Sequence, residues 1–186
     1  MEFEEIEKYV KEKISEKRFY HSQCVSKRCM ELASRYDISI LKAKSIGIFH
    51  DIAKELTEDQ KLRYAEDNDI PVDQIERLHP NLLHGKIAAD IGKKEFEFTD
   101  DMVQAIAYHT TGKENMSMLD KILFVADATG DDRTWEDVEY VKELAEKNIN
   151  DAVMYLFNIE ITDRVKKNKI IHINTILARN DILFKS

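Results

Sequence analysis

The segment "GIFHDIAKEL" (47–56) places a histidine and an aspartate side by side within an apolar stretch. A helix through this segment and the residues before it has one face with positions three or four apart, namely Ile40, Ala43, Gly47, His50 and Lys54. Such spacing is typical of an amphipathic helix whose apolar side packs against a core. The segment therefore predicts an inward-facing helix that brings His50 into the interior.

The composition favours an all-α fold. The 186 residues include only five Gly and two Pro, and 43% are hydrophobic while 34% are charged, as in ordinary soluble globular proteins. A chain of this length can bury a sizeable core, and we expect a single domain over residues 1–186. Segments of helical period alternate with short breaks, and no stretch alternates as a strand does, which predicts roughly eight to ten helices.

Capping residues predict where some of the helices begin. Thr57 and Gln60 form a capping box that starts a helix at about residue 58, and Ser117 with Asp120 is a weaker version of the same signal. The segments 2–17 and 135–169 have amphipathic patterns, and we expect them to complete the core or to support a homodimer. The two cysteines, Cys24 and Cys29, are expected to be buried free thiols, because their spacing in one helix does not suit a disulfide.

Charge and hydropathy exclude some classes of function. A net charge of −8 argues against broad nucleic-acid binding, which needs clustered Lys and Arg. A small anionic ligand is still compatible if the site supplies local positive charge, as a metal cluster would. The longest apolar run, "ILFVA" (122–126), is too short to span a bilayer, and the acidic start "MEFEEIEKYV" lacks a signal-peptide layout. We expect a cytoplasmic protein with no membrane partner.

Four histidines and two aspartates fall on apolar faces of five different predicted helices. They are His21, His50, Asp51, His84, His109 and Asp127. A single such histidine is usually a core residue bonded to a backbone carbonyl. Six buried ionisable groups are costly unless they pair or bind a metal, so one polar cluster is favoured over six separate burials. The alternative is a helical scaffold without metal.

The residue types indicate which metals would suit such a cluster. Six nitrogen and oxygen ligands exceed the needs of one tetrahedral site, whereas a two-metal centre with a bridging carboxylate would use them all. Imidazole and carboxylate ligands suit Fe, Mn, Co, Zn or Ni, and the sequence does not choose among them.

Five ordered motifs carry a family resemblance. "RFYHS" (18–22), "HDIAK" (50–54), "LLHG" (82–85), "HTTG" (109–112) and "LDKILFVAD" (119–127) resemble those of the HD-domain phosphohydrolases. The chain is most similar to the YqeK-like branch, the symmetrical diadenosine tetraphosphate hydrolases, and its tail "IHINTILARN" (171–180) also fits that branch. The resemblance implies an all-α HD-domain helical bundle, with a metal-site core at about 18–133 and additional C-terminal helices at about 135–186.

The resemblance also implies a site and a reaction. The metal ligands would be the six residues named above, in a di-iron-type centre that Asp51 bridges. Two divalent transition-metal ions, Fe first and Mn, Co, Zn or Ni as alternatives, would hold a bridging hydroxide. That hydroxide would attack a phosphorus of diadenosine tetraphosphate and release two ADP, with Asp51 and Lys54 as catalytic residues.

Cations and a loop near the ligands are candidates for substrate contacts. We expect Lys54, Arg18 and Arg133 to meet the phosphates, because each lies near a ligand in the sequence. The loop of Thr110, Thr111 and Gly112 follows His109 directly and offers hydroxyls and amides to phosphate or nucleoside. Gly112 equally suits a helix end. His79 and His172 share no clear face with the cluster and are left out of it.

The sequence departs from the family in one place and so leaves the substrate open. After Asp127 the family usually has Tyr-Ile-Glu-Pro, with an Arg two residues on. Here the four residues 128–131 are Ala-Thr-Gly-Asp, although Arg133 is retained. The alternatives are an HD phosphohydrolase of another nucleotide, such as a cyclic dinucleotide or a guanosine alarmone, and a non-catalytic nucleotide-binding HD module.

Overall fold

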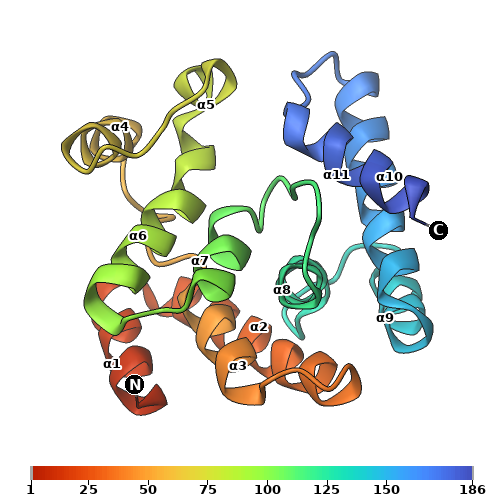
Figure 1. The fold of residues 1–186 in the computed structure, drawn as a ribbon, viewed down its shortest axis with the longest axis horizontal. Helices are drawn as coiled ribbons and strands as arrows, with labels where there is room; N and C mark the ends of the chain where they lie inside the picture. Colours follow the sequence, from red (N-terminus) through yellow and green to blue (C-terminus); the bar gives the residue numbers. More distant parts are fainter. Residues whose placement is uncertain (1, 186) are drawn as a thin grey trace.

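The computed structural model describes residues 2–185 and contains, within that range, helices and their connections but no strand (Figure 1). The helices are α1 (Phe3–Lys13), α2 (Glu16–Arg35), α3 (Ile40–Phe49), α4 (Glu58–Asp67), α5 (Gln74–Leu78), the 3₁₀ helix η1 (Pro80–Leu83), α6 (His84–Phe96), α7 (Asp100–Ala107), α8 (Met118–Thr129), α9 (Val138–Lys147), α10 (Ile149–Lys166) and α11 (Ile173–Phe184). The all-α prediction is confirmed. The number of helices was underestimated, because α5 is too short to show a helical period.

Helix α8 occupies the middle of the fold. It packs against α2, α3 and α7 on one side and against α9 and α10 on the other. Figure 1 shows α8 almost end-on, with α4–α7 on its left, α2 and α3 below it and α9–α11 on its right. This position brings the end of α8 close to residues from the first half of the chain.

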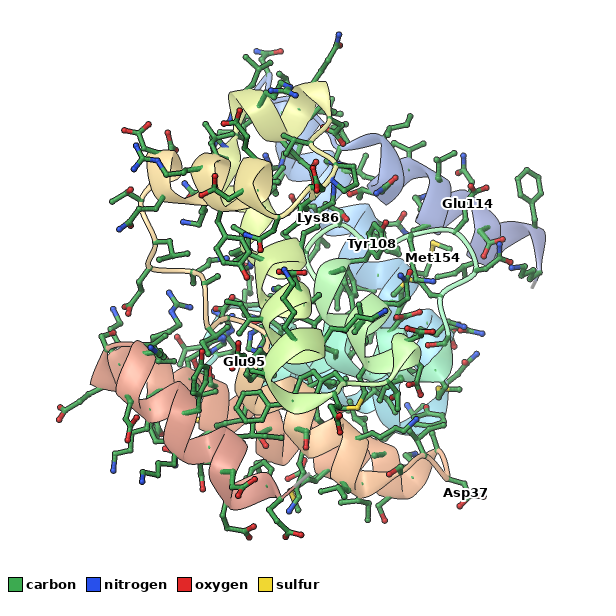
Figure 2. All side chains as sticks on the ribbon, turned by 60° about the vertical axis from the view of Figure 1, so that its left-hand side comes forward. Asp37, Lys86, Glu95, Tyr108, Glu114 and Met154 are labelled. Atoms are coloured by element: carbon green, nitrogen blue, oxygen red, sulfur yellow. The ribbon has the colours of Figure 1, made fainter. Side chains whose placement is uncertain are left out.

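Helices α2 and α3 pack closely against each other beside the site. A turn at Asp37, at the outer edge of the molecule (Figure 2), joins the two helices. A Cβ atom on Gly47 would lie 2.6 Å from the Ser26 Cα atom, and Ser26 Oγ donates to the Lys44 carbonyl at 2.8 Å. A glycine is therefore required at position 47, because the α3 backbone lies against the α2 backbone there. This packing fixes the distance between the side chains of α2 and those of α3.

The predicted helix through 47–56 ends earlier than expected. Helix α3 stops at Phe49, and the following residues form turns in which Lys54 N–H donates to the Asp51 carbonyl. The buried Lys61 ammonium donates to the carbonyls of Lys54 and Leu56 and so holds these turns in place. The prediction that Lys54 shares a helical face with His50 is wrong, because Lys54 belongs to a turn.

The capping predictions hold. Both bonds of the Thr57–Gln60 capping box are present, so α4 starts at Glu58 as predicted, and the Ser117–Asp120 box opens α8. The amphipathic segment 2–17 is not one helix, because α1 ends at Lys13 and Ser15 accepts the Arg18 N–H and caps α2.

Two further sequence predictions concern the cysteines and the possibility of a membrane-spanning helix. Both cysteines are free and buried, as predicted. Among the described helices, none has the combination of length and hydrophobicity needed to cross a bilayer.

We predict that Gly47→Ala lowers the stability of the fold. The added methyl group would meet the α2 backbone, and such overpacking costs about 1–3 kcal/mol. A loss of 1 kcal/mol lowers Tm by about 2–4 °C in chains of 150–250 residues, so thermal unfolding should detect it. Gly130→Ala is the comparison and should lower Tm less, since its Cβ would meet the Asp132 side-chain oxygen at 3.0 Å and not a helix backbone at 2.6 Å. An unchanged Tm for Gly47→Ala would contradict the packing argument.

Candidate metal centre

The structure brings all six predicted ligand side chains together. His21 lies on α2, and His50 and Asp51 follow the end of α3. The other three are His84 at the start of α6, His109 just after α7 and Asp127 in the last turn of α8. All but Asp127 are buried. Residues that lie far apart in the sequence thus share one small volume.

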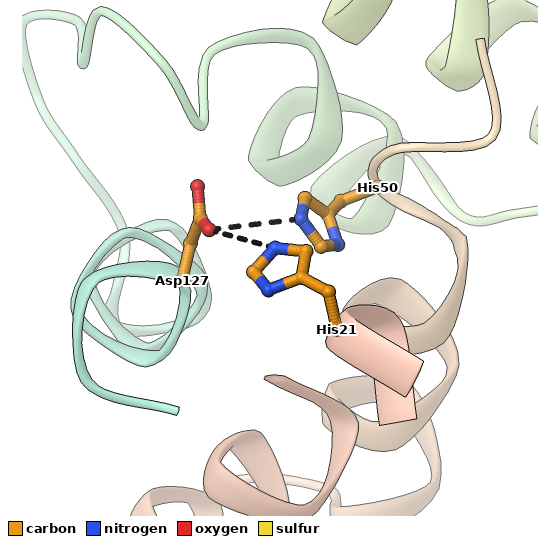
Figure 3. Close-up of side chains that lie close together, drawn as sticks. All are labelled: His21, His50 and Asp127. Atoms are coloured by element: carbon orange, nitrogen blue, oxygen red, sulfur yellow. Dashed lines mark ion pairs between the residues drawn. The ribbon is translucent and has the colours of Figure 1, made fainter. Parts of the chain in front are cut away.

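One group of donors surrounds Asp127. His21 Nε2 lies 3.2 Å and His50 Nε2 lies 3.9 Å from the Asp127 Oδ1 atom, and the three side chains point toward one another from three segments (Figure 3). Their ligand atoms all lie within 4.8 Å of each other. This group could hold one metal ion.

A second group surrounds Asp51 and shares His50 with the first. The Asp51 Oδ1 atom lies 3.1 Å from His84 Nε2 and 3.7 Å from His109 Nε2. Its Oδ2 atom lies 3.7 Å from His50 Nε2 and 3.9 Å from His21 Nε2. The two oxygens of Asp51 therefore face different pairs of histidines, which is the arrangement that a bridging carboxylate needs.

The backbone sets the orientation of three histidines in the same way. The Nδ1 atoms of His50, His84 and His109 lie 2.8, 2.5 and 2.7 Å from carbonyl oxygens three residues earlier in the chain. A carbonyl only accepts, so each Nδ1 carries the proton and each Nε2 has a lone pair. This pattern is usual for metal-ligating histidines.

His21 is oriented by a carboxylate instead. Its Nδ1 atom lies 2.8 Å from the Asp132 Oδ2 atom. Because Asp132 accepts the Nδ1 proton, the Nε2 lone pair of His21 also faces inward. An anionic acceptor makes the imidazole a stronger donor to a cation.

The cluster contains polar atoms that need a cation. His84 Nε2 and His109 Nε2 lie 3.0 Å apart, although both carry lone pairs. His50 Nε2 and Asp51 Oδ1 are buried without a hydrogen-bond partner among residues 2–185. Unpaired buried polar atoms and facing lone pairs are costly. The donor set therefore fits divalent metal ions.

The protonation states of the clustered side chains also favour metal binding. Burial lowers the pKa of both His50 and His84 to about 4, so both imidazoles are neutral near pH 7 and can act as ligands. Burial alone would raise the pKa of Asp51, but the neighbouring histidines hold it below its ordinary value. The pKa of Asp127 is also below its ordinary value although burial opposes this, because His21 and His50 lie beside the carboxylate.

The three predicted phosphate-binding cations all lie at the cluster. Arg18 Nη1 lies 2.8 Å from Asp51 Oδ2, and Arg133 Nη2 lies 2.6 Å from Asp127 Oδ1. Lys54 Nζ lies 3.1 Å from His84 Nε2 and 3.8 Å from Asp51 Oδ1. Lys54 is thus beside the cluster even though it is not on a helix.

In the loop after His109, Thr110 lies beside the cluster, whereas Thr111 and Gly112 contact other parts of the fold. Thr110 Oγ1 lies 3.3 Å from His109 Nε2 and 3.5 Å from His84 Nε2. The Thr111 carbonyl accepts a hydrogen bond from Thr175 Oγ1, which holds Thr111 against α11. Gly112 is buried with a φ of 68°, and a Cβ there would lie 2.6 Å from Phe157. Packing accounts for this glycine, and Thr110 is the residue nearest the ligands.

A third acidic group does not fit a metal. Asp73, Glu76 and His172 lie close enough to hold one. However, His172 Nδ1 accepts the Asn174 N–H at 3.2 Å and caps α11, so its Nε2 carries the proton. Glu76 is paired with Lys86 at 2.7 Å. This agrees with leaving His172 out of the predicted cluster.

Asp132 was missed as a contact of a ligand. It lies in the connection after α8, where no helical period indicates which way a side chain points. Only the packing of this connection against α2 places it beside His21. Trp135, whose Nε1 donates to the Ala128 carbonyl at 2.8 Å, was missed for the same reason.

Comparison with known proteins identifies the family. Residues 18–130 match the HD domain. The chain belongs to the HD-domain family. The match contains all six residues of the cluster together with Arg18 and Lys54, and the helices after α8 lie outside it. The chain is an HD hydrolase, as the named relatives of this family also indicate.

Three relatives illustrate the similarity. The symmetrical bis(5'-nucleosyl)-tetraphosphatase of Bacillus subtilis is 30% identical over 92% of each chain. The protein of the same name from Halalkalibacterium halodurans is 33% identical over 95% of this chain and 94% of its own. A crystal structure from Clostridium acetobutylicum, described as a "predicted HD superfamily hydrolase involved in NAD metabolism", has a TM-score of 0.95 and 29% identity, covering 100% of this chain and 99% of its own.

We predict that Asp132→Ala weakens metal binding about 10–100-fold, the usual cost of losing a group that orients a ligand. Titration with Mn²⁺ against a competing chelator measures the affinity. Asp131→Ala is the matched control, because the neighbouring Asp131 is exposed and pairs with Lys27 at 2.7 Å. Equal affinities in the two variants would show that Asp132 does not support His21.

Proposed function

We propose that this HD-domain protein is a metal-dependent hydrolase that cleaves dinucleoside tetraphosphates symmetrically, converting diadenosine tetraphosphate into two ADP. The observation that carries the proposal is the cluster of inward-facing Nε2 lone pairs and carboxylates, bordered by Arg18, Lys54 and Arg133. The substrate is suggested by the two relatives that are named for this activity and align along nearly their whole length.

The proposed cofactor is a pair of divalent transition-metal ions, with iron as the first choice and Mn, Co, Zn or Ni as alternatives. Its proposed ligands are His21, His50 and Asp127 for one ion and His84, His109 and Asp51 for the other, with Asp51 reaching both groups. When bound, such a pair supplies a hydroxide nucleophile at neutral pH and neutralises phosphoryl oxygens.

The residues around the proposed ligands would bind and position the phosphates. Lys54 and Arg18 stand next to Asp51, and Arg133 stands next to Asp127, so phosphates held over the cluster would meet cations from three sides. Phosphoryl transfer depends mainly on positioning and charge neutralisation. We assign Asp51 and Lys54 to the reacting centre and Arg18, Arg133 and Thr110 to substrate binding.

The products provide the first test. Symmetric cleavage of diadenosine tetraphosphate should give ADP alone, as measured by chromatography of the reaction of the metal-loaded protein. ATP with AMP would show asymmetric cleavage and contradict the proposal. A panel with a cyclic dinucleotide and a guanosine alarmone tests the alternative substrates, and faster turnover of either would replace the substrate named here.

Metal removal and Asp51→Asn provide the second test. We expect about two metal ions per chain by elemental analysis, loss of activity after chelation and recovery when metal is restored. Asp51→Asn should lower kcat at least about 100-fold, beyond the range typical of residues that only orient a ligand. Asp131→Asn, on the exposed surface, is the control. Fewer than one metal ion per reconstituted chain would rule out a two-metal site.

A further inference from the structure

Two hollows lie beside the ligand cluster. One reaches Asp127, and the other reaches Asn81, whose carbonyl orients His84. Thr110 and Glu160 line both, so the two hollows adjoin at Thr110, which lies beside His84 and His109. Their volumes are about 300 and 210 Å³, at or below the lower end of the ~300–1,000 Å³ typical of drug-sized ligands. Each hollow alone is too small for a dinucleoside polyphosphate.

The hollow at Asp127, here called the aromatic hollow, lies between α8 and α10. Its walls are largely apolar and include Phe124, Trp135 and Leu156. The Trp135 ring is held by its hydrogen bond to the Ala128 carbonyl, and Arg133 stands between this hollow and the cluster. A flat, rigid aromatic wall next to a phosphate-binding cation suits a nucleobase that stacks.

The hollow at Asn81, here called the His172 hollow, lies between η1 and the α10–α11 pair. His79, Thr111, Arg164 and His172 are among its lining residues. His172 is only 8% exposed. Because its Nδ1 atom caps α11, its Nε2 carries a proton, and this nitrogen lies 3.0 Å from the Asp73 Oδ2 atom without a well-directed hydrogen bond to it. A buried N–H that no acceptor in the described residues satisfies with good geometry, on a residue that lines the hollow, suits an acceptor on a base or a ribose.

We propose, on the basis of the function proposed above, that the two hollows are unlike subsites for the two nucleosides of one dinucleoside tetraphosphate. The tetraphosphate passes over the cluster at Thr110, which places the central phosphoanhydride bond at the ligands. The oxygen of water bonds to one central phosphorus, and the bond from that phosphorus to the bridging oxygen breaks. The bridging oxygen leaves with the other nucleoside diphosphate, and the protons of water pass to products and solvent.

The arrangement makes the enzyme asymmetric although its substrate is symmetric. One nucleoside binds by stacking against Trp135, and the other binds by hydrogen bonds that include His172. The two halves of the substrate therefore depend on different side chains, and each subsite can be removed without touching a ligand of the cluster.

Calorimetric titration of the metal-loaded chain with ADP tests the proposal. We expect two ADP molecules per chain with unequal affinities. Trp135→Ala should weaken one of them about 5- to 150-fold, the range that corresponds to loss of base stacking. His172→Asn should weaken the other, since Asn preserves the cap of α11 but lacks the Nε2 donor. Tyr140→Ala is the control, because Tyr140 is an exposed aromatic residue outside both hollows.

Binding of a single ADP, or weakening of the same ADP by both variants, would overturn the two-subsite proposal. The measurement needs no turnover, so it separates this proposal from the proposed function. A chain that binds two ADP but does not cleave diadenosine tetraphosphate would contradict only the function. A chain that cleaves it to ADP but binds one ADP, with KM unchanged in both variants, would contradict only the subsites.

Discussion

The interaction on which the site depends is the mutual repulsion of buried electron-rich atoms. Four imidazole Nε2 atoms and two carboxylates face one small volume, and His84 Nε2 and His109 Nε2 come within 3.0 Å. Such a group is unfavourable unless positive charge lies among its members. The nearby Arg18, Lys54 and Arg133 supply part of that charge from the rim, and the centre of the cluster is suited to metal ions.

The rest of the fold serves to hold this unfavourable group in place. Three histidines are oriented by carbonyl oxygens of their own helical turns, so the backbone itself determines which nitrogen faces inward. Gly47 allows α3 to approach α2 closely and also provides one of these carbonyls. Lys61 holds the turns after Asp51 and donates to Asn81 as well. The same contacts therefore support both packing and ligand geometry.

Helical periodicity was sufficient to bring the candidate ligands into one cluster but not to describe their surroundings. His21, His84 and Asp127 lie on helices whose apolar spacing indicates an inward face, and this face is where the structure has them. Lys54 was expected at the cluster for an incorrect reason, because hydrogen bonds from Lys61 replace the helix with turns. Asp132, Trp135 and His172 lie in connections or caps, where orientation depends on tertiary packing that a helical period does not describe.

The order of the ligands along the chain has a consequence for folding. His21 and Asp127 approach within 3.2 Å although more than half of the chain separates them. An ion held by both would close a long loop in the manner of a covalent cross-link, and it would bind the folded chain in preference to the unfolded one. The centre can be completed only after α8 has packed against α2, so occupancy of the centre would report that the two halves of the chain have assembled.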